Sequence, residues 1–202
     1  GVAFYALLLF IVVALLYGVV AQHRMYWQSA VVGLPPEIPD AAVPAWGTTV
    51  ALEQYTPAEL ERALDDLSQM GMVWLRQTIP WSEIEPSPGR FEWEKWDRMI
   101  EAVSRRGFRL ILVLDTSPEW ARHPEDAGQP LAPPADPATF GRFADAVAKR
   151  YGAQVDYYQL WDEPNLRPHW GVEGHIDPAG YAALLRAAAT AIRAADPTAT
   201  IL

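Results

Sequence analysis

The chain opens with an unbroken apolar stretch, Gly1–Ala21, that contains no charged residue. At about 1.5 Å of rise per residue, a helix of this length reaches roughly 31 Å, enough to cross the hydrocarbon core of a bilayer. A core helix of a soluble domain is disfavoured because the stretch shows no polar face. A cleaved signal peptide is a second alternative, because Val19 and Ala21 suit a small-residue cleavage site. The stretch is longer than a typical signal-peptide core, which favours a retained single-pass anchor.

The next segment, residues 22–45, is rich in proline and has no periodic apolar pattern. Such a composition favours an extended, semi-rigid chain. We therefore predict a membrane-spanning helix over residues 1–21, a tether over residues 22–45 and a soluble domain over residues 46–202. The lipid bilayer is an expected partner, and the soluble domain is expected on the extracytoplasmic side.

From Trp46 onward, short β-favouring runs alternate with helix-periodic segments. The runs predict strands over residues 47–52, 72–75, 108–114, 155–161 and 199–202. Four helices are predicted between them, and three of these begin with a capping Thr or Asp followed by Pro. The capping pairs are Thr56-Pro57, Asp136-Pro137 and Asp177-Pro178.

Strict alternation of strands and helices predicts a parallel sheet with right-handed crossovers. Two α/β architectures fit, an open doubly wound sheet and a (β/α)₈ TIM barrel. No Gly-x-Gly-x-x-Gly sequence follows the first strand, which weakens the dinucleotide-binding version of the open sheet. A full barrel needs about 250 residues. We therefore expect residues 46–202 to form the first four βα units and the start of strand five. The natural chain is then expected to continue past Leu202, or a partner to cover the edge.

Composition narrows the function more than the fold. The formal net charge is −9, which argues against nucleic acid as a partner. The absence of cysteine excludes disulfides and Cys-ligated metals. Nine Trp and eight Tyr form a heavy aromatic load, which suits either core packing or stacking on sugar rings.

The fourth predicted strand ends in two carboxylates and a proline, in the sequence Trp161–Asn165. Because Pro164 cannot donate to a strand ladder, the strand should stop there. Asp162, Glu163 and Asn165 are then displayed at the carboxyl end of a parallel strand. In α/β sheets and barrels, ligands are bound and chemistry is done at this end.

The motifs around these strand ends resemble those of clan A glycoside hydrolases, which include cellulases and β-xylosidases. Trp81–Trp93 resembles the Trp-x-x-x-Glu-Pro-x-x-Gly-x-Phe-x-Trp signature found after strand two. Trp161–Asn165 is similar to the Trp-Asn-Glu-Pro-Asn motif of strand four. Arg76 falls where cellulase-like members carry an arginine at the end of strand two, and Ser117–Trp120 resembles their Pro-x-Trp loop.

This resemblance implies a retaining hydrolase of O-glycosidic bonds in which Glu163 is the acid/base, buried at the strand end. The second carboxylate, a nucleophile about 5–5.5 Å away, belongs at the end of strand seven and is not expected within these residues. The implied partner is a glycoside, an oligosaccharide or a polysaccharide, and no cofactor or metal is expected. The expected substrate-binding residues are Arg76, Trp81, Asp115, Trp120, Asp162 and Asn165.

Two departures from the clan keep other functions open. Asp162 stands where the clan usually has an asparagine, and no histidine follows strand three. A non-catalytic accessory subunit of a larger membrane complex is therefore one alternative, and a carbohydrate-binding module is another. A cluster of histidine and acidic residues in the loop after the fourth predicted strand lacks the spacing of common metal-ligand motifs, so we predict no metal site there. Its members are His169, Glu173, His175 and Asp177.

Overall fold

A computed structural model of the chain describes residues 2–29, 46–155, 157–166, 169–170 and 177–202. Contacts between residues divide the chain into two compact units, Gly1–Val43 and Pro44–Leu202. Most of the predicted tether lies outside the described residues, and each unit is therefore described by itself.

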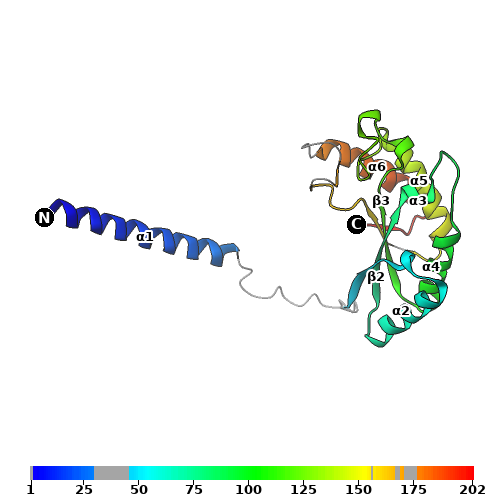
Figure 1. The fold of residues 1–202 in the computed structure, drawn as a ribbon, viewed down its shortest axis with the longest axis horizontal. Coiled ribbons are helices and arrows are strands. Elements are labelled where there is room, and N and C mark those ends of the chain that lie inside the picture. The colour runs from blue at the N-terminus through cyan, green and yellow to red at the C-terminus, as the bar shows by residue number, and fades with distance from the viewer. Residues whose placement is uncertain (1, 30–45, 156, 167–168, 171–176) are drawn as a thin grey trace. The chain divides into compact units, whose positions relative to one another are not determined.

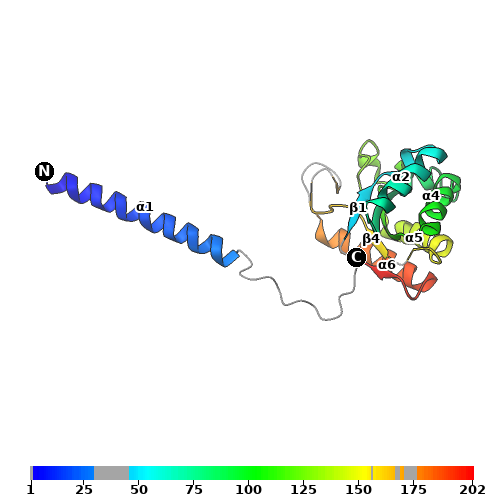
Figure 2. The same ribbon diagram turned by 90° about the horizontal axis from the view of Figure 1, so that it is seen from below.

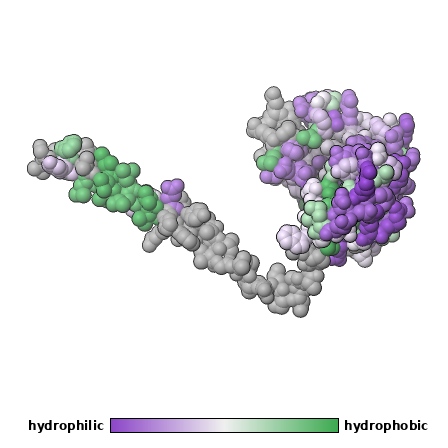
Figure 3. All heavy atoms as spheres, turned by 60° about the horizontal axis from the view of Figure 1, so that its bottom comes forward, coloured by the Kyte–Doolittle hydropathy of each residue, from purple (hydrophilic) through white to green (hydrophobic). Residues whose placement is uncertain are grey.

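The first unit contains one long helix, α1 (Val2–Ser29). Its segment Phe4–Gln22 is long and apolar enough to cross a membrane, and none of it is buried. Apolar side chains surround this segment (Figure 3). A signal sequence near an amino terminus has the same properties, so the helix by itself supports either an anchor or a signal sequence.

The second unit alternates strands and helices from its first residues to its last (Figure 1). Its strands are β1 (Gly47–Val50), β2 (Trp74–Pro80), β3 (Arg109–Asp115), β4 (Tyr157–Leu160) and β5 (Thr200–Ile201). The α-helices between them are α2 (Pro57–Gln69), α3 (Trp81–Ile84), α4 (Glu94–Arg105), α5 (Pro137–Tyr151) and α6 (Pro178–Ala195). Short 3₁₀ helices are η1 (Leu52–Gln54), η2 (Glu119–Ala121) and η3 (Pro124–Asp126).

The five strands form one parallel sheet in the order β1-β2-β3-β4-β5. A doubly wound sheet would reverse its strand order at a switch point, whereas a barrel adds each strand beside the preceding one. The sequential order and the helices α2, α4, α5 and α6 on one face therefore confirm the barrel prediction (Figures 1 and 2). The sheet is a five-strand part of a (β/α)₈ barrel.

The predicted helix starts are confirmed at atomic detail. The Thr56 hydroxyl and the Glu59 carboxylate form a complete capping box at the start of α2. The Asp136 carboxylate accepts a hydrogen bond from the Ala138 amide, and the Asp177 carboxylate accepts one from the Gly180 amide. Each cap satisfies amide groups that the first helical turn leaves unpaired.

Strand β2 is longer than the sequence pattern predicts, and this moves Arg76. The apolar run predicts a strand over residues 72–75 that closes at Arg76, whereas β2 continues through Gln77 and Thr78 to Pro80. Gln77 is nevertheless buried, since its side-chain oxygen accepts a hydrogen bond from the Leu52 amide. Arg76 is therefore the third residue of β2, and its expected place at the strand's end is wrong.

The two faces of the sheet have different characters. Side chains of β2 alternate between buried and half-buried positions, and the buried ones face the helices. The other face carries Trp74, Arg76 and Thr78 of β2 and Arg109 of β3. At its amino-terminal end, the Arg109 guanidinium lies over the rings of Trp74 and Tyr157. The polar side chains of Arg109, Arg76 and Thr78 thus line this face from the amino-terminal toward the carboxyl ends of the strands.

Candidate active site

Strands β2, β3 and β4 end at the same edge of the sheet. Pro80 pairs with Asp115, and Leu114 pairs with Leu160, so the segment after β4 begins beside the last residue of β3. The sequence predicted this gathering of Asp115 with Asp162 and Glu163, because parallel strands present their carboxyl ends together.

The turn after β4 has an unusual backbone. Trp161 and Glu163 have positive φ angles of 70° and 46°, and Thr116 after β3 has a φ of 53°. Residues with side chains adopt this left-handed conformation at a cost of order 1–3 kcal/mol, and only when their surroundings hold them there. Such strain is concentrated at functional sites.

The Trp161 side chain and backbone hold this turn in place. The Trp161 amide donates to the Leu114 carbonyl at 2.8 Å, and its indole Nε1 donates to the His169 carbonyl at 2.7 Å. Its ring is 1% exposed and packs edge-on against Phe140 and Trp170. Glu163 is therefore presented from a fixed backbone rather than from a free loop.

Asp162 is bound by two side chains from the face of the sheet that lies opposite the helices. Arg76 Nη2 lies 2.6 Å from Asp162 Oδ1, and Gln159 Nε2 donates to the same oxygen at 3.1 Å. Arg76 Nε also donates to Gln159 Oε1 at 2.9 Å, which closes a three-residue network. An asparagine at this position would offer an N–H donor to substrate, whereas Asp162 offers carboxylate oxygens that Arg76 already engages.

Asp115 is buried at the end of β3, and its carboxyl has a perturbed pKa. Burial raises the pKa of Asp115 from its ordinary value of 3.8 to about 6, and the charge of Asp162 adds to the increase. Hydrogen bonds from the Thr116 and Asp162 amides and the charge of His169 oppose it. This carboxyl can therefore carry a proton in mildly acidic solution.

Glu163 lies at the open side of this cluster. Its side chain is 50% exposed, so the burial expected from its strand-end position is wrong. Glu163 itself is one of the left-handed residues of the turn after β4. Its Oε2 lies 3.3 Å from Nε2 of His169. A carboxyl at this place can reach a ligand that binds over the strand ends.

The expected aromatic platforms have other roles. Trp81 is 0% exposed and packs against Phe140 and Phe143, so its ring has no free face for a sugar. Its Nε1 donates to the buried Glu85 carboxylate, so this glutamate holds the Trp81 ring in place. Trp120 is half-buried, lies edge-on to Trp81 and donates from Nε1 to the Glu85 carbonyl.

Two residues of this arrangement were not predicted as site residues. Gln159 joins Arg76 to Asp162, and the two-residue period of a strand would have placed it on the same face as Trp161.

His169 was considered only as a metal ligand. Among the described residues no cluster fits a metal ion, and Glu173 and His175 lie outside those residues. Asn165 is exposed beside Glu163.

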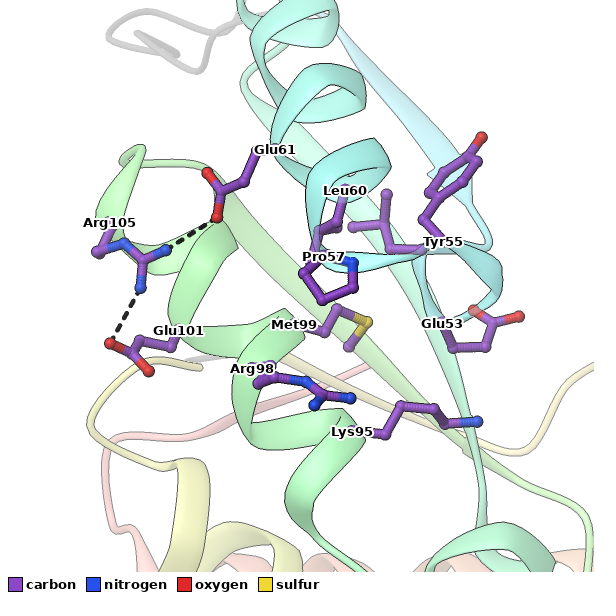
Figure 4. Close-up of a pocket in the computed structure, with 11 residues that line it drawn as sticks. Glu53, Tyr55, Pro57, Leu60, Glu61, Lys95, Arg98, Met99, Glu101 and Arg105 are labelled. Atoms are coloured by element: carbon purple, nitrogen blue, oxygen red, sulfur yellow. Dashed lines mark hydrogen bonds and ion pairs between the residues drawn. The ribbon is translucent and has the colours of Figure 1, made fainter.

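A cavity of about 180 Å³ lies elsewhere, in the helix layer between η1, α2 and α4 (Figure 4). Leu60 and Met99 contribute apolar lining, and Arg105 is ion-paired with both Glu61 and Glu101. Barrel enzymes do their chemistry at the carboxyl ends of the strands, so this cavity in the helix layer is not a candidate active site.

Comparison with known proteins finds one family model and several solved structures that are similar to the second unit. The Glyco_hydro_42 family model, described as beta-galactosidase, matches residues 50–128. No curated protein sequence matches the chain. The resemblance to glycoside hydrolases drawn from the motifs is confirmed by this match and by similar solved structures.

Three of these structures illustrate the likeness. A family 39 glycoside hydrolase from the gut symbiont Bacteroides cellulosilyticus has a TM-score of 0.58 and 22% identity, covering 78% of this chain and 30% of its own. Endo-glycoceramidase II from Rhodococcus sp. has a TM-score of 0.54 and 19% identity, covering 77% and 47%. The beta-glycosidase BGL167 has a TM-score of 0.58 and 17% identity, covering 77% and 54%. The chain thus spans only part of the length of the structures that share its fold.

Proposed function

We propose that this chain is the acid/base-bearing part of a retaining glycoside hydrolase held at a membrane by α1. One observation carries the proposal. Glu163 follows a barrel strand on a strained, well-anchored turn, and its carboxyl is accessible over the strand ends. The family match and the fold of the similar structures support the same reaction class.

The proposed reaction is a double displacement with two carboxyl groups. Protonated Glu163 donates to the glycosidic oxygen as the leaving group departs, and a second carboxylate forms the glycosyl-enzyme. The Glu163 carboxylate then takes a proton from the water that releases the sugar. The second carboxylate should lie about 5–5.5 Å from Glu163. We place it on the seventh strand of the barrel, outside these residues.

Neither neighbouring aspartate fits the role of nucleophile. Asp162 is engaged by Arg76 and Gln159, and Asp115 is buried behind it. We propose instead that Asp162 and Asn165 contact sugar hydroxyl groups around the scissile bond, and that Asp115, buried at the end of β3, does not touch the sugar. Arg76 then acts by fixing the Asp162 carboxylate, and Trp81 supports the site through packing rather than through sugar contact.

The matched family suggests β-galactosides as the first substrates to test. The experiment compares the full-length protein with Glu163→Gln on a panel of aryl glycosides. Glu163→Gln should lower hydrolysis by roughly 10²–10⁴-fold, the usual contribution of general acid–base catalysis. Glu119→Gln removes an exposed carboxylate from the loop after β3 and should leave the rate unchanged. Unchanged hydrolysis in Glu163→Gln would refute the assignment.

The engagement of Asp162 by Arg76 also suits a protein that has lost catalysis, which supports the accessory-subunit alternative. A wild-type protein that hydrolyses no glycoside and co-purifies with a membrane complex would establish that alternative. Sugar binding that survives Glu163→Gln, again without hydrolysis, would identify a carbohydrate-binding module.

Anchoring by α1 is tested separately from catalysis. If α1 is retained, the protein should stay in the membrane fraction after alkaline carbonate extraction, and its mature amino terminus should include the helix. A mature terminus just after Ala21, with the protein in the soluble fraction, would identify a signal peptide instead. Protease accessibility of the second unit in intact cells tests its extracytoplasmic placement.

A further inference from the structure

The segment after β4 brings a histidine to the proposed acid/base. His169 Nε2 lies 3.3 Å from Glu163 Oε2, so the imidazole and the carboxyl are in direct contact. We propose that His169 is a positioning residue that holds the Glu163 carboxyl in its working orientation. This inference rests on the proposed function of Glu163 and adds a second side chain to that site.

The backbone of His169 is fixed to the same turn that presents Glu163. The His169 carbonyl accepts a hydrogen bond from Trp161 Nε1 at 2.7 Å. The His169 amide donates to the Leu166 carbonyl, and the Leu166 amide donates to the Glu163 carbonyl, both at 2.9 Å. These bonds form a closed path from Trp161 through His169 back to Glu163, so the backbones that carry the imidazole and the carboxyl are joined to each other.

The residue after His169 secures the path from the outside. Trp170 is 6% exposed and packs edge-on against both Trp161 and Tyr181. Tyr181 in turn donates from its hydroxyl to the Leu160 carbonyl at the end of β4. His169 is thus carried on a buried aromatic anchor, while its own side chain remains 32% exposed toward the site.

Glu163 has a physical need for such a partner. Its side chain is half exposed and has three rotatable bonds, so without a contact it would sample many orientations. A general acid must lie within hydrogen-bonding reach of the leaving oxygen, and a displacement of about 1 Å can cost 100-fold in rate. Contact with an imidazole on a fixed backbone removes much of this freedom before substrate binds.

Other charged groups near the imidazole are consistent with this role. The charge of Asp162 raises the pKa of Asp115 and the charge of His169 lowers it, and Asp162 is itself bound by Arg76. Among the described residues, His169 therefore faces carboxylates from the ends of both β3 and β4. Of these, Glu163 is the one at contact distance.

The test uses the full-length protein and two leaving groups. His169→Ala should lower kcat/KM by roughly 10-fold or more for an alkyl glycoside, whose departure requires a proton, a fraction of the 10²–10⁴-fold supplied by general acid catalysis. For a dinitrophenyl glycoside, which departs without protonation, kcat/KM should change less than about threefold, since general acid catalysis contributes little there. His169→Gln keeps an N–H donor and should recover most of the loss, and Leu166→Ala is the matched control in the same loop. Equal losses with both leaving groups, or the same pattern in Leu166→Ala, would overturn the inference.

A second readout does not depend on turnover or on the folding of a His169 variant. In ¹⁵N-histidine-labelled protein at fixed pH, the Nε2 resonance of His169 should move in Glu163→Ala and stay in place in Glu119→Gln. A resonance that is the same in wild type and Glu163→Ala would show that the contact is absent. Hydrolysis lost in Glu163→Gln but unaffected by His169→Ala overturns this inference alone. If the wild-type protein hydrolyses no glycoside, the proposed function is overturned, and the inference about His169 falls with it.

Discussion

Replacing Asp115 by asparagine should stabilise the protein, and the gain should depend on pH. Asp115 is buried at the end of β3, where burial and the charge of Asp162 raise its pKa to about 6. Asparagine has nearly the same shape and has no charge to bury. Its side-chain oxygen can still accept the hydrogen bond from the Thr116 amide, which the carboxylate accepts at 2.8 Å.

The size of the gain follows from the raised pKa. A pKa that rises from 3.8 to about 6 on folding corresponds to about 3 kcal/mol, at 1.36 kcal/mol per pKa unit. Below about pH 3, a unit under the unfolded pKa, the carboxyl is protonated in both states and costs nothing. Between about pH 4 and pH 6 the unfolded chain releases the proton while the folded protein retains it. The free energy of unfolding of the wild type therefore falls as pH rises through this window.

The assay is denaturant unfolding followed by tryptophan fluorescence, with Asp115→Asn and wild type compared from pH 4 to pH 8. The variant should be more stable by less than 1 kcal/mol at pH 4 and by about 3 kcal/mol at pH 7.5. Other titrating groups are shared by the two proteins and largely cancel in the difference. Asp66→Asn, on the exposed surface of α2, controls for the loss of one carboxylate.

Two results would refute this reasoning. A stability difference that does not change between pH 4 and pH 7.5 would show that Asp115 does not titrate in the folded protein with a raised pKa. An Asp115→Asn variant that is less stable than wild type at pH 7.5 would show that the carboxylate is stabilised at this site. Either result would remove the electrostatic cluster from the description of the strand ends.

Two further predictions concern Arg76 and Trp81. Arg76→Met should destabilise the protein by about 1–3 kcal/mol, because it leaves the half-buried Asp162 carboxylate without its cation. A double-mutant cycle with Asp162→Asn, measured by denaturant unfolding, should give a coupling of about 0.5–3 kcal/mol, and strictly additive effects would contradict the network. Trp81→Phe should cost about 1–3 kcal/mol by leaving the buried Glu85 without its indole donor, yet leave KM unchanged. A several-fold rise in KM in Trp81→Phe, measured on an aryl glycoside, would return that residue to a role in substrate binding.

The fold was accessible from local sequence signals. Capping pairs such as Thr56-Pro57 and Asp136-Pro137 mark helix starts because they satisfy amide groups within one turn, which requires no knowledge of the tertiary structure. The end of β2 was not accessible in this way. Gln77 reads as a polar interruption, and its burial depends on the Leu52 amide, 25 residues earlier in the chain.

The candidate site shows the same division. The motif around Glu163 predicted its place at a strand end, but the partners of the motif come from distant parts of the chain. Arg76 meets Asp162 across 86 positions, and this contact depends on the register of β2, β3 and β4. Trp81 illustrates the opposite error, because a sequence motif cannot show that the aromatic side chains of helix α5 cover this tryptophan.

The central claim, that Glu163 is the acid/base of a retaining hydrolase, is tested most directly by azide rescue of Glu163→Ala. With a dinitrophenyl glycoside that the wild type hydrolyses, the variant should form the glycosyl-enzyme but release it slowly, since no base activates water. Azide needs no base and should restore turnover, giving a glycosyl azide with the same anomeric configuration as the substrate. Hydrolysis by Glu163→Ala at the wild-type rate, or a glycosyl azide of inverted configuration, would contradict the account.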